Sequence, residues 1–293
     1  MNLRLEDVNY TYGKDTAYES KALQYIHLNI GENEWIGIIG QTGSGKSTLI
    51  QHLNGLLRPD QGAIYYNNQN IYQDEFDQKM LCCKVGLVFQ YPEHQLFASD
   101  VFEDVCFGPK NLGLSKKEIE ERACKALEQV GISRELYHKS PFELSGGQQR
   151  RVAIAGVLAM NPEILILDEP TAGLDPAGKR RIFQLIEKLR KERKITVIFV
   201  SHSMEDVAKY ATRLIVMQEG KIVFDQTPEN VFCHQEELRS MGLDVPKITQ
   251  IMSQLKTEGF EVRDNILTVE EAVEEIIKDL NKNNINNMKE IKE

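Results

Sequence analysis

Residues 40–47 of the chain read Gly40-Gln41-Thr42-Gly43-Ser44-Gly45-Lys46-Ser47. This stretch fits the pattern G-x-x-x-x-G-K-[ST] at every fixed position. The apolar run from Trp35 to Ile39 precedes it, and a run with helical periodicity from Ser47 to Leu57 follows it and ends before Pro59. A glycine-rich loop between a buried strand and a helix is the context in which this pattern binds the phosphates of a nucleoside triphosphate.

The residue types of the loop predict its contacts. Glycines let the backbone wrap around a phosphate with its N–H groups pointing at the negative charge. The Lys46 ammonium is expected to reach the β- and γ-phosphates, and the Ser47 hydroxyl is expected to bind Mg²⁺. An ordinary glycine turn would not need the flanking strand and helix. The predicted nucleotide contacts are Gly40, Gln41, Thr42, Gly43, Ser44, Gly45, Lys46, Ser47 and Thr48.

A pair of acids follows a second apolar run, Ile164 to Leu167. In an open parallel sheet, ligands bind at the carboxyl ends of the strands, so Asp168 and Glu169 are expected beside the phosphates. Asp168 is placed to hold Mg²⁺ through water, and Glu169 to orient and deprotonate the attacking water. A surface Asp-Glu turn is the alternative, and the preceding buried strand argues against it.

Strands and helices are predicted to alternate along the chain. Residues 3–30 show the short apolar alternations of antiparallel strands, whereas residues 85–89 and 195–200 are continuous apolar runs, as in buried parallel strands. Ser115 and Glu118 have capping-box spacing, and residues 178–193 favour a helix. This alternation predicts an α/β fold with a largely parallel sheet.

The composition changes after about residue 228. The remainder is acidic, with helix-like stretches at 247–255 and 269–280 around a short extended piece, and residues 281–293 are expected to fray. We therefore predict a main domain over residues 1–228 and a small C-terminal α+β domain over 229–293.

Composition and charge exclude several classes of protein. The net charge of −9 among 293 residues disfavours a general nucleic-acid binder. The start of the chain does not resemble a secretory signal, and no apolar stretch approaches the length that crosses a bilayer. The five cysteines show no metal-type spacing, which fits a reducing cytoplasm. The neighbours Cys82 and Cys83 could form a redox site, but ordinary strand residues are the preferred interpretation.

Residues 144–148 read Leu144-Ser145-Gly146-Gly147-Gln148, and this pentapeptide resembles the signature of ATP-binding cassette (ABC) ATPases. The resemblance covers residues 1–228. Other residues fall in the order of that family: Tyr12 resembles the aromatic that stacks on adenine, Gln90 the Q-loop glutamine, Asp175 the D-loop aspartate and His202 the switch histidine. Many relatives have Asp after that histidine, where this chain has Ser203.

The resemblance implies the roles of these residues. It implies catalysis by Glu169, His202 and Gln90, with Mg²⁺ bound by Ser47, Gln90 and Asp168. It also implies a P-loop NTPase fold with a RecA-like, mostly parallel core, an N-terminal antiparallel β subdomain and a helical signature subdomain at about residues 91–161.

A dimer follows from the signature. Ser145 and the N–H groups of Gly146 and Gly147 stand at a predicted helix start, which forms an anion site. In the ABC family, that site closes over the γ-phosphate held by the opposite subunit. We therefore expect a second ATPase subunit, identical or paralogous, and ATP that joins the two.

A narrower resemblance is to the ATPases of energy-coupling factor (ECF) transporters. It rests on residues 88–97, on Phe107-Gly108-Pro109 and on residues 153–160. It implies a peripheral subunit at the cytoplasmic face of the membrane, a membrane-embedded scaffold (T) subunit and a separate substrate-binding (S) subunit for a vitamin or a transition-metal ion. The C-terminal region would contribute to ATPase pairing, with a detachable acidic tail as the alternative.

The same resemblance places a docking groove for the scaffold beside the Q-loop. The candidates are Pro92, Gln95, Leu96 and Phe97. The alternative for Leu96 and Phe97 is that they pack the core of the helical subdomain.

Rival functions have weaker support. DNA-repair relatives insert long coiled coils or zinc modules between phosphate loop and signature, which residues 48–143 leave no room for, and translation-type relatives carry two cassettes in one chain. A non-enzymatic nucleotide-dependent module conflicts with the presence of Glu169. The basic segment 179–194 could face lipid, but a solvated helix face is the preferred interpretation.

Overall fold

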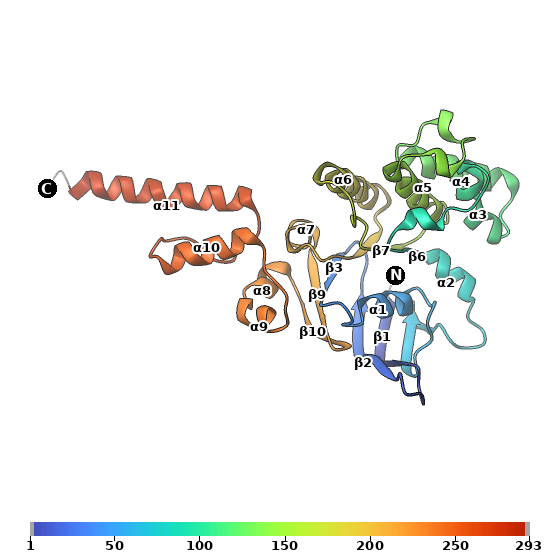
Figure 1. The fold of residues 1–293 in the computed structure, drawn as a ribbon, viewed down its shortest axis with the longest axis horizontal. Coiled ribbons are helices and arrows are strands. Elements are labelled where there is room, and N and C mark those ends of the chain that lie inside the picture. Colours follow the sequence, from blue (N-terminus) through green and yellow to red (C-terminus); the bar gives the residue numbers. More distant parts are fainter. Residues whose placement is uncertain (1–2, 291–293) are drawn as a thin grey trace.

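A six-stranded sheet forms the centre of the protein (Figure 1). The structure is a computed structural model that describes residues 3–290, with side chains through residue 280. The strand order is β10-β9-β3-β8-β7-β6, in which β10 is antiparallel to β9 and the other neighbours are parallel. The strands are β3 (Trp35–Ile39), β6 (Val85–Val88), β7 (Ile164–Asp168), β8 (Thr196–Val200), β9 (Arg213–Gln218) and β10 (Lys221–Gln226). The continuous apolar runs are buried strands, which confirms the prediction of a largely parallel sheet.

A second, antiparallel sheet with the order β2-β1-β4-β5 lies beside the first (Figure 1). Its strands are β1 (Leu3–Tyr12), β2 (Ser20–Ile30), β4 (Gln61–Tyr66) and β5 (Gln69–Asn70). The predicted antiparallel strands at the start of the chain are thus confirmed. Apolar residues of both sheets share one core cluster with helix α1 (Lys46–Leu53).

Helices of the middle of the chain gather at one end of the molecule (Figure 1). They are α2 (Gln78–Lys84), η1 (Pro92–Gln95), α3 (Val101–Asn111), α4 (Lys116–Gln129), η2 (Arg134–Leu136), η3 (Pro141–Glu143) and α5 (Gly146–Leu158). The predicted capping box at Ser115 and Glu118 is present. Helices α6 (Pro176–Arg193) and α7 (Met204–Tyr210) alternate with the later strands. Helix α1 ends before the predicted Leu57, because Gly55 takes a left-handed conformation with φ of 79°.

The C-terminal region contains α8 (Pro228–Phe232), α9 (Gln235–Ser240), α10 (Lys247–Thr257) and α11 (Val269–Glu290). Helices α10 and α11 lie at the end of the molecule away from α3, α4 and α5 (Figure 1). The expectation of an α+β unit here is corrected, since no strand follows β10 within residues 227–290. The piece between α10 and α11 contacts helices instead of a strand: Val262 and Ile266 pack with Met252 and Ala272.

The main hydrophobic core continues past residue 228. Buried side chains that share the core cluster of α5 and α6 include Val231, Phe232, Leu238, Leu243 and Val245. The small cluster between α10 and α11 is separate. The division into domains at residue 228 stays a prediction. So does the frayed end, because α11 is continuous through Glu290 and residues 291–293 lie outside the described part of the chain.

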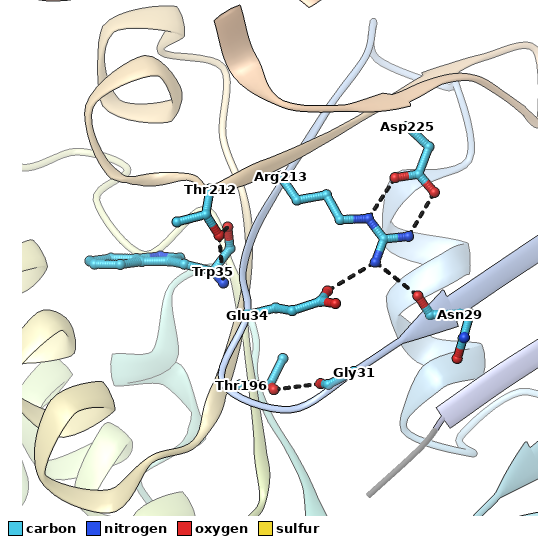
Figure 2. Close-up of polar contacts among 8 residues, drawn as sticks. All are labelled: Asn29, Gly31, Glu34, Trp35, Thr196, Thr212, Arg213 and Asp225. Carbon is cyan, nitrogen blue, oxygen red and sulfur yellow. Dashed lines mark hydrogen bonds and ion pairs between the residues drawn. The ribbon is translucent and has the colours of Figure 1, made fainter. Parts of the chain in front are cut away.

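A polar network at the amino ends of the central strands joins the two sheets (Figure 2). The Arg213 guanidinium donates to both carboxylate oxygens of Asp225, at 2.6 and 2.7 Å. Its Nη1 donates to Glu34 and to the Asn29 carbonyl oxygen, both at 2.9 Å. Trp35 lies beside this network (Figure 2) and is only 4% exposed. These contacts fix the amino ends of the strands. The loops that carry the predicted site lie at the opposite, carboxyl ends of the strands.

Candidate active site

The phosphate loop joins β3 to α1, as predicted. Its fixed glycines are required by the fold: a Cβ at Gly40 would lie 2.3 Å from the Met217 carbonyl oxygen, and one at Gly45 would lie 2.4 Å from that of Ala22. The Lys46 ammonium donates to the carbonyl oxygens of Gly40 at 2.7 Å and Gln41 at 2.8 Å. Burial lowers the pKa of Lys46, while the charges of Glu169 and Asp168 oppose that shift. The ammonium is therefore held at the loop, next to both acids.

Three predicted catalytic side chains meet at the carboxyl end of β7. Gln90 Nε2 donates to Glu169 Oε2 at 2.9 Å, and His202 Nε2 lies 3.0 Å from Glu169 Oε1. The Glu169 backbone has a left-handed φ of 47°, and its N–H donates to the Val200 carbonyl oxygen at 3.2 Å. Backbone and carboxylate are thus both fixed, which suits a group that must aim at one water.

Asp168 and Ser47 form the candidate Mg²⁺ site. The Ser47 hydroxyl hydrogen-bonds the Asp168 carboxylate. Burial and the neighbouring charge of Glu169 raise the pKa of Asp168, while Ser47, Lys46 and His202 oppose that shift. The hydroxyl and carboxylate oxygens of this pair lie beside the phosphate loop and are the ligand type that a hard cation such as Mg²⁺ prefers. The charge of the cation would relieve the repulsion between Asp168 and Glu169.

Tyr12 lies over the first turn of α1. Its hydroxyl is 3.3 Å from Thr48 Oγ1, and the residue is 42% exposed, so part of it is accessible to a base. Tyr10 meets the Tyr12 ring edge-on at 4.9 Å, and the His52 ring meets Tyr10 at 4.8 Å. Sequence reasoning missed Tyr10 and His52. The alternation of Tyr10 and Tyr12 on one face of a strand was the available signal for the first.

The signature begins helix α5, with Ser145 at its N-cap. Gln148 Oε1 accepts hydrogen bonds from the Ser145 N–H and hydroxyl, both at 2.9 Å. A Cβ added at Gly146 or Gly147 would meet no atom within 4 Å. In contrast to Gly40 and Gly45, these glycines are therefore not required by packing within the described chain. They leave a helix N-terminus open for the approach of an anion.

Comparisons with known proteins identify the family. A family model described as ABC transporter matches residues 23–172. The chain belongs to the ABC transporter family. It is 52% identical over 278 residues to the energy-coupling factor transporter ATP-binding protein EcfA2 of Caldanaerobacter subterraneus subsp. tengcongensis, covering 95% of this chain and 97% of that protein. It is 51% identical over 282 residues to EcfA2 of Clostridium tetani, covering 96% and 98%.

Solved ABC structures share the fold. The structure of cbiO1 from Clostridium perfringens, part of the ABC transporter complex cbiONQ, has a TM-score of 0.72 and 41% identity and covers 86% of this chain and 98% of that one. The dimeric cassette MJ0796 bound to ADP and Pi has a TM-score of 0.67 and 33% identity, covering 77% and 98%. The chain is an ABC ATPase and binds ATP. No helix of the described residues is long and apolar enough to span a membrane.

The predicted D-loop and switch regions carry helix caps. Asp175 is the N-cap of α6 and accepts from the Gly178 N–H at 2.9 Å. Ser203 is the N-cap of α7 and accepts from the Asp206 N–H at 3.2 Å. Ser203 therefore fixes the start of the next helix, and His202, the predicted switch histidine, keeps its contact with Glu169 without an Asp at position 203.

A groove of about 680 Å³ lies beside the predicted Q-loop. Gln95, Leu96 and Phe97 line it, whereas Pro92 is buried in η1 and does not. Leu96 is 5% exposed and belongs to the main core, in line with the alternative interpretation for that residue, but Phe97 is 60% exposed. The groove is also lined by residues of the other two ECF-like stretches: Phe107, Gly108, Ala153, Val157 and Met160.

One buried residue beside the site was given no role in the sequence analysis. Arg150 is 3% exposed and donates from Nη1 to the carbonyl oxygens of Pro170 and Ala172, directly after Glu169. Helical spacing places it on one face with Ala153 and Ile154, which are buried, and this was a usable signal. Its neighbour Arg151 instead bonds the carbonyl oxygens of Val130 and Gly131.

Proposed function

We propose that this chain is the ATP-hydrolysing, energy-coupling subunit of an ECF-type ABC importer that takes up a vitamin or a transition-metal ion. The observation that carries the hydrolytic part is the Glu169 carboxylate held between Gln90 and His202, beside the lysine of the phosphate loop. The transport part is supported by the names of the relatives and by the groove beside the Q-loop.

The residues divide the chemistry among them. Lys46 and the loop N–H groups bind the β- and γ-phosphates, and Tyr12 stacks on the adenine. Ser47, Asp168 and Gln90 would hold Mg²⁺, which would neutralise phosphate charge when bound. Glu169 takes a proton from the water that attacks the γ-phosphorus, and His202 orients Glu169. Each side chain stays on a fixed element, so little reorganisation accompanies the reaction.

The site is completed by a second ATPase subunit. The open N–H groups of Gly146 and Gly147 bind the γ-phosphate held by the partner, and Asp175 lies in the D-loop that faces it. The Gly-rich start of α5 has no packing partner that would occupy this position within the described chain. ATP therefore joins two subunits, and hydrolysis releases them.

Helix α11 supports pairing through the C-terminal region. Its exposed apolar side chains, Val269, Val273, Ile277 and Leu280, follow helical spacing, and each is at least 49% exposed. An apolar stripe of this kind suits a matching helix of the second ATPase. We propose that residues 229–293 hold the two subunits together while the nucleotide sites open and close.

The groove receives the membrane scaffold. Phe97 and Phe107 meet edge-on at 4.8 Å and offer an apolar surface that a helix of the T subunit can cover. This places the ATPase at the cytoplasmic face of the membrane as a peripheral subunit, with the substrate recognised by a separate S subunit.

Purification from membranes tests the transport assignment. Tagged wild-type chain should co-purify with hydrophobic integral membrane proteins, and Phe97→Glu should lose them while keeping ATPase activity, because a charge in the groove is costly to bury. Tyr18→Glu is the matched control, since Tyr18 is 90% exposed outside the groove. Retention of the membrane proteins by Phe97→Glu would overturn the docking site, and wild-type binding to DNA instead of membrane proteins would overturn the transporter.

A further inference from the structure

Arg150 links three functional elements of the ATPase. It lies on α5, just after the signature, and is 3% exposed. Its Nη1 donates to the Pro170 carbonyl oxygen at 3.1 Å and to the Ala172 carbonyl oxygen at 3.0 Å. Its Nη2 lies 3.4 Å from both carboxylate oxygens of Glu93. A buried guanidinium is stable only when such acceptors surround it, so the three elements are tied together.

The first link leads to the catalytic carboxylate. Pro170 and Ala172 belong to the turn that Glu169 begins, because the Ala172 N–H donates to the Glu169 carbonyl oxygen at 3.0 Å. Glu169 has φ of 47°, a strained value for a residue with a Cβ, and needs its surroundings to hold it. Arg150 bonds two carbonyls of this turn and so supports the backbone from which the Glu169 side chain projects.

The second link leads to the groove. Glu93 lies on η1, between Gln90, which bonds Glu169, and Gln95 and Phe97, which line the groove. The Glu93 side chain is 22% exposed, and that of Arg150 is 4% exposed. Because Glu93 is part of η1, a partner helix that moves η1 also moves the carboxylate that the Arg150 guanidinium faces.

We propose that Arg150 is a positioning residue that couples the position of η1, and hence occupation of the groove, to the aim of Glu169. The planar guanidinium reaches the carbonyls from one nitrogen and Glu93 from the other, so a displacement at one side is transmitted to the other. Arg150 does not touch nucleotide in this role. The inference rests on the proposed function, because the groove is where the membrane partner docks.

Substitution of Arg150 tests the positioning role by steady-state kinetics. In Arg150→Met we expect kcat to fall by at least about tenfold with the KM for ATP changed by less than about twofold, since misplacement of a base by an ångström costs up to about a hundredfold. Arg150→Lys keeps the charge but not the planar fork, so it should recover only part of kcat.

Arg193→Met is the matched control. Arg193 is partly buried, donates to a backbone carbonyl as Arg150 does, in this case that of Leu158 at 2.9 Å, and lies outside the site. This variant should lower the melting temperature as Arg150→Met does, yet keep kcat. An equal loss of kcat in both variants, or an unchanged kcat in Arg150→Met, would show that Arg150 has a structural role only.

Glu93 tests the coupling itself. Glu93→Gln should lower kcat by a few-fold, and the double variant Arg150→Met, Glu93→Gln should be no slower than Arg150→Met alone, because the link is already cut. Multiplied effects in the double variant would refute the coupling. Should Arg150→Met fail to fold, an unchanged kcat in Glu93→Gln alone would refute it equally. A wild-type chain that lacks ATPase activity would instead contradict the proposed function, and a failure to bind membrane proteins leaves these kinetic outcomes unaffected.

Discussion

At the scale of the residue, Glu169 shows how a side chain can be aimed. One carboxylate oxygen accepts from Gln90 and the other lies beside His202, while the backbone is held by Val200. The carboxylate needs its negative charge to take a proton, whereas an amide of the same shape keeps an acceptor oxygen for only one of the two partners. Shape and proton transfer can therefore be separated by experiment.

Replacement of Glu169 by Gln should nearly abolish ATP turnover and leave ATP binding intact. The amide keeps the volume of the side chain but does not act as a base, so kcat should fall by roughly 10²–10⁴-fold. The affinity for ATP, measured by calorimetry, should stay within a few-fold of wild type, and the closed dimer should accumulate in size-exclusion chromatography. ATPase activity near the wild-type value would show that another group activates the water.

Substitution of Lys46, in contrast, should affect ATP binding itself. The Lys46 ammonium lies against the loop, next to Asp168 and Glu169, where the proposed function places the phosphates. In Lys46→Ala we expect ATP binding itself to weaken by about tenfold or more, because a charge-assisted contact in a partly buried site is lost. Calorimetric titration measures this directly. An unchanged dissociation constant would remove Lys46 from the binding site.

His52 should make stability depend on pH. It is fully buried on α1, and burial lowers the pKa of its ring, while its hydrogen bond to the Thr48 carbonyl opposes that shift. The unfolded chain then binds a proton more readily, so the stability contribution is complete above about pH 6.5 and is lost as the pH falls through the lower folded pKa. Urea denaturation between pH 5 and 7.5 should show a shallower pH dependence in His52→Gln. An unchanged pH dependence in His52→Gln would show that His52 does not carry this part of the stability.

At the scale of the element, strands and caps were predictable and long-range contacts were not. The apolar runs of β3, β6, β7 and β8 are local patterns, as are the phosphate loop and the capping box of α4. The contact of Arg150 with Pro170 and Ala172 depends on how α5 packs against the loop after β7, which no local pattern encodes. The expected α+β unit after residue 228 failed for the same reason, because tertiary packing decides whether a short extended piece becomes a strand.

The start of α5 predicts a conflict between stability and catalysis. Gly147 lies in open space within the described chain, so Gly147→Ala should raise the free energy of unfolding by up to about 1 kcal/mol. The methyl group would stand where the partner's γ-phosphate approaches, so ATPase activity should fall by at least about tenfold. Gly156→Ala, on the same helix and in equally open space, controls for the gain in stability. Full activity in Gly147→Ala would argue against closure of the signature on a partner's nucleotide.

At the scale of the whole molecule, the C-terminal region has two relations to the rest. Helices α8 and α9 and the turn after them insert Val231, Phe232, Leu238, Leu243 and Val245 into the main core. Helices α10 and α11 share a small cluster of their own and present the apolar stripe of α11 to the outside. The first part therefore belongs to the fold of the ATPase, and the second is available for pairing.

Truncation separates these two parts. A chain that ends at residue 246 keeps all five of these buried side chains and should unfold cooperatively and bind ATP. A chain that ends at residue 228 loses them, and each is worth roughly 1.5–3 kcal/mol of burial against a total stability of about 5–15 kcal/mol. It should be unfolded or aggregated, as circular dichroism would show. Equal melting temperatures for the two chains would contradict this division of the core.

The place of Trp35 governs how the protein can be observed. It is the chain's one tryptophan, and it lies at the amino end of β3, about 16 Å along the strand from the phosphate loop. Its ring packs near Tyr210 and under the Arg190 guanidinium, shielded from water. Intrinsic tryptophan fluorescence will therefore report the exposure of the protein interior on denaturation. It will change little when ATP is titrated, so an optical assay of ATP binding needs a dye placed near Tyr12.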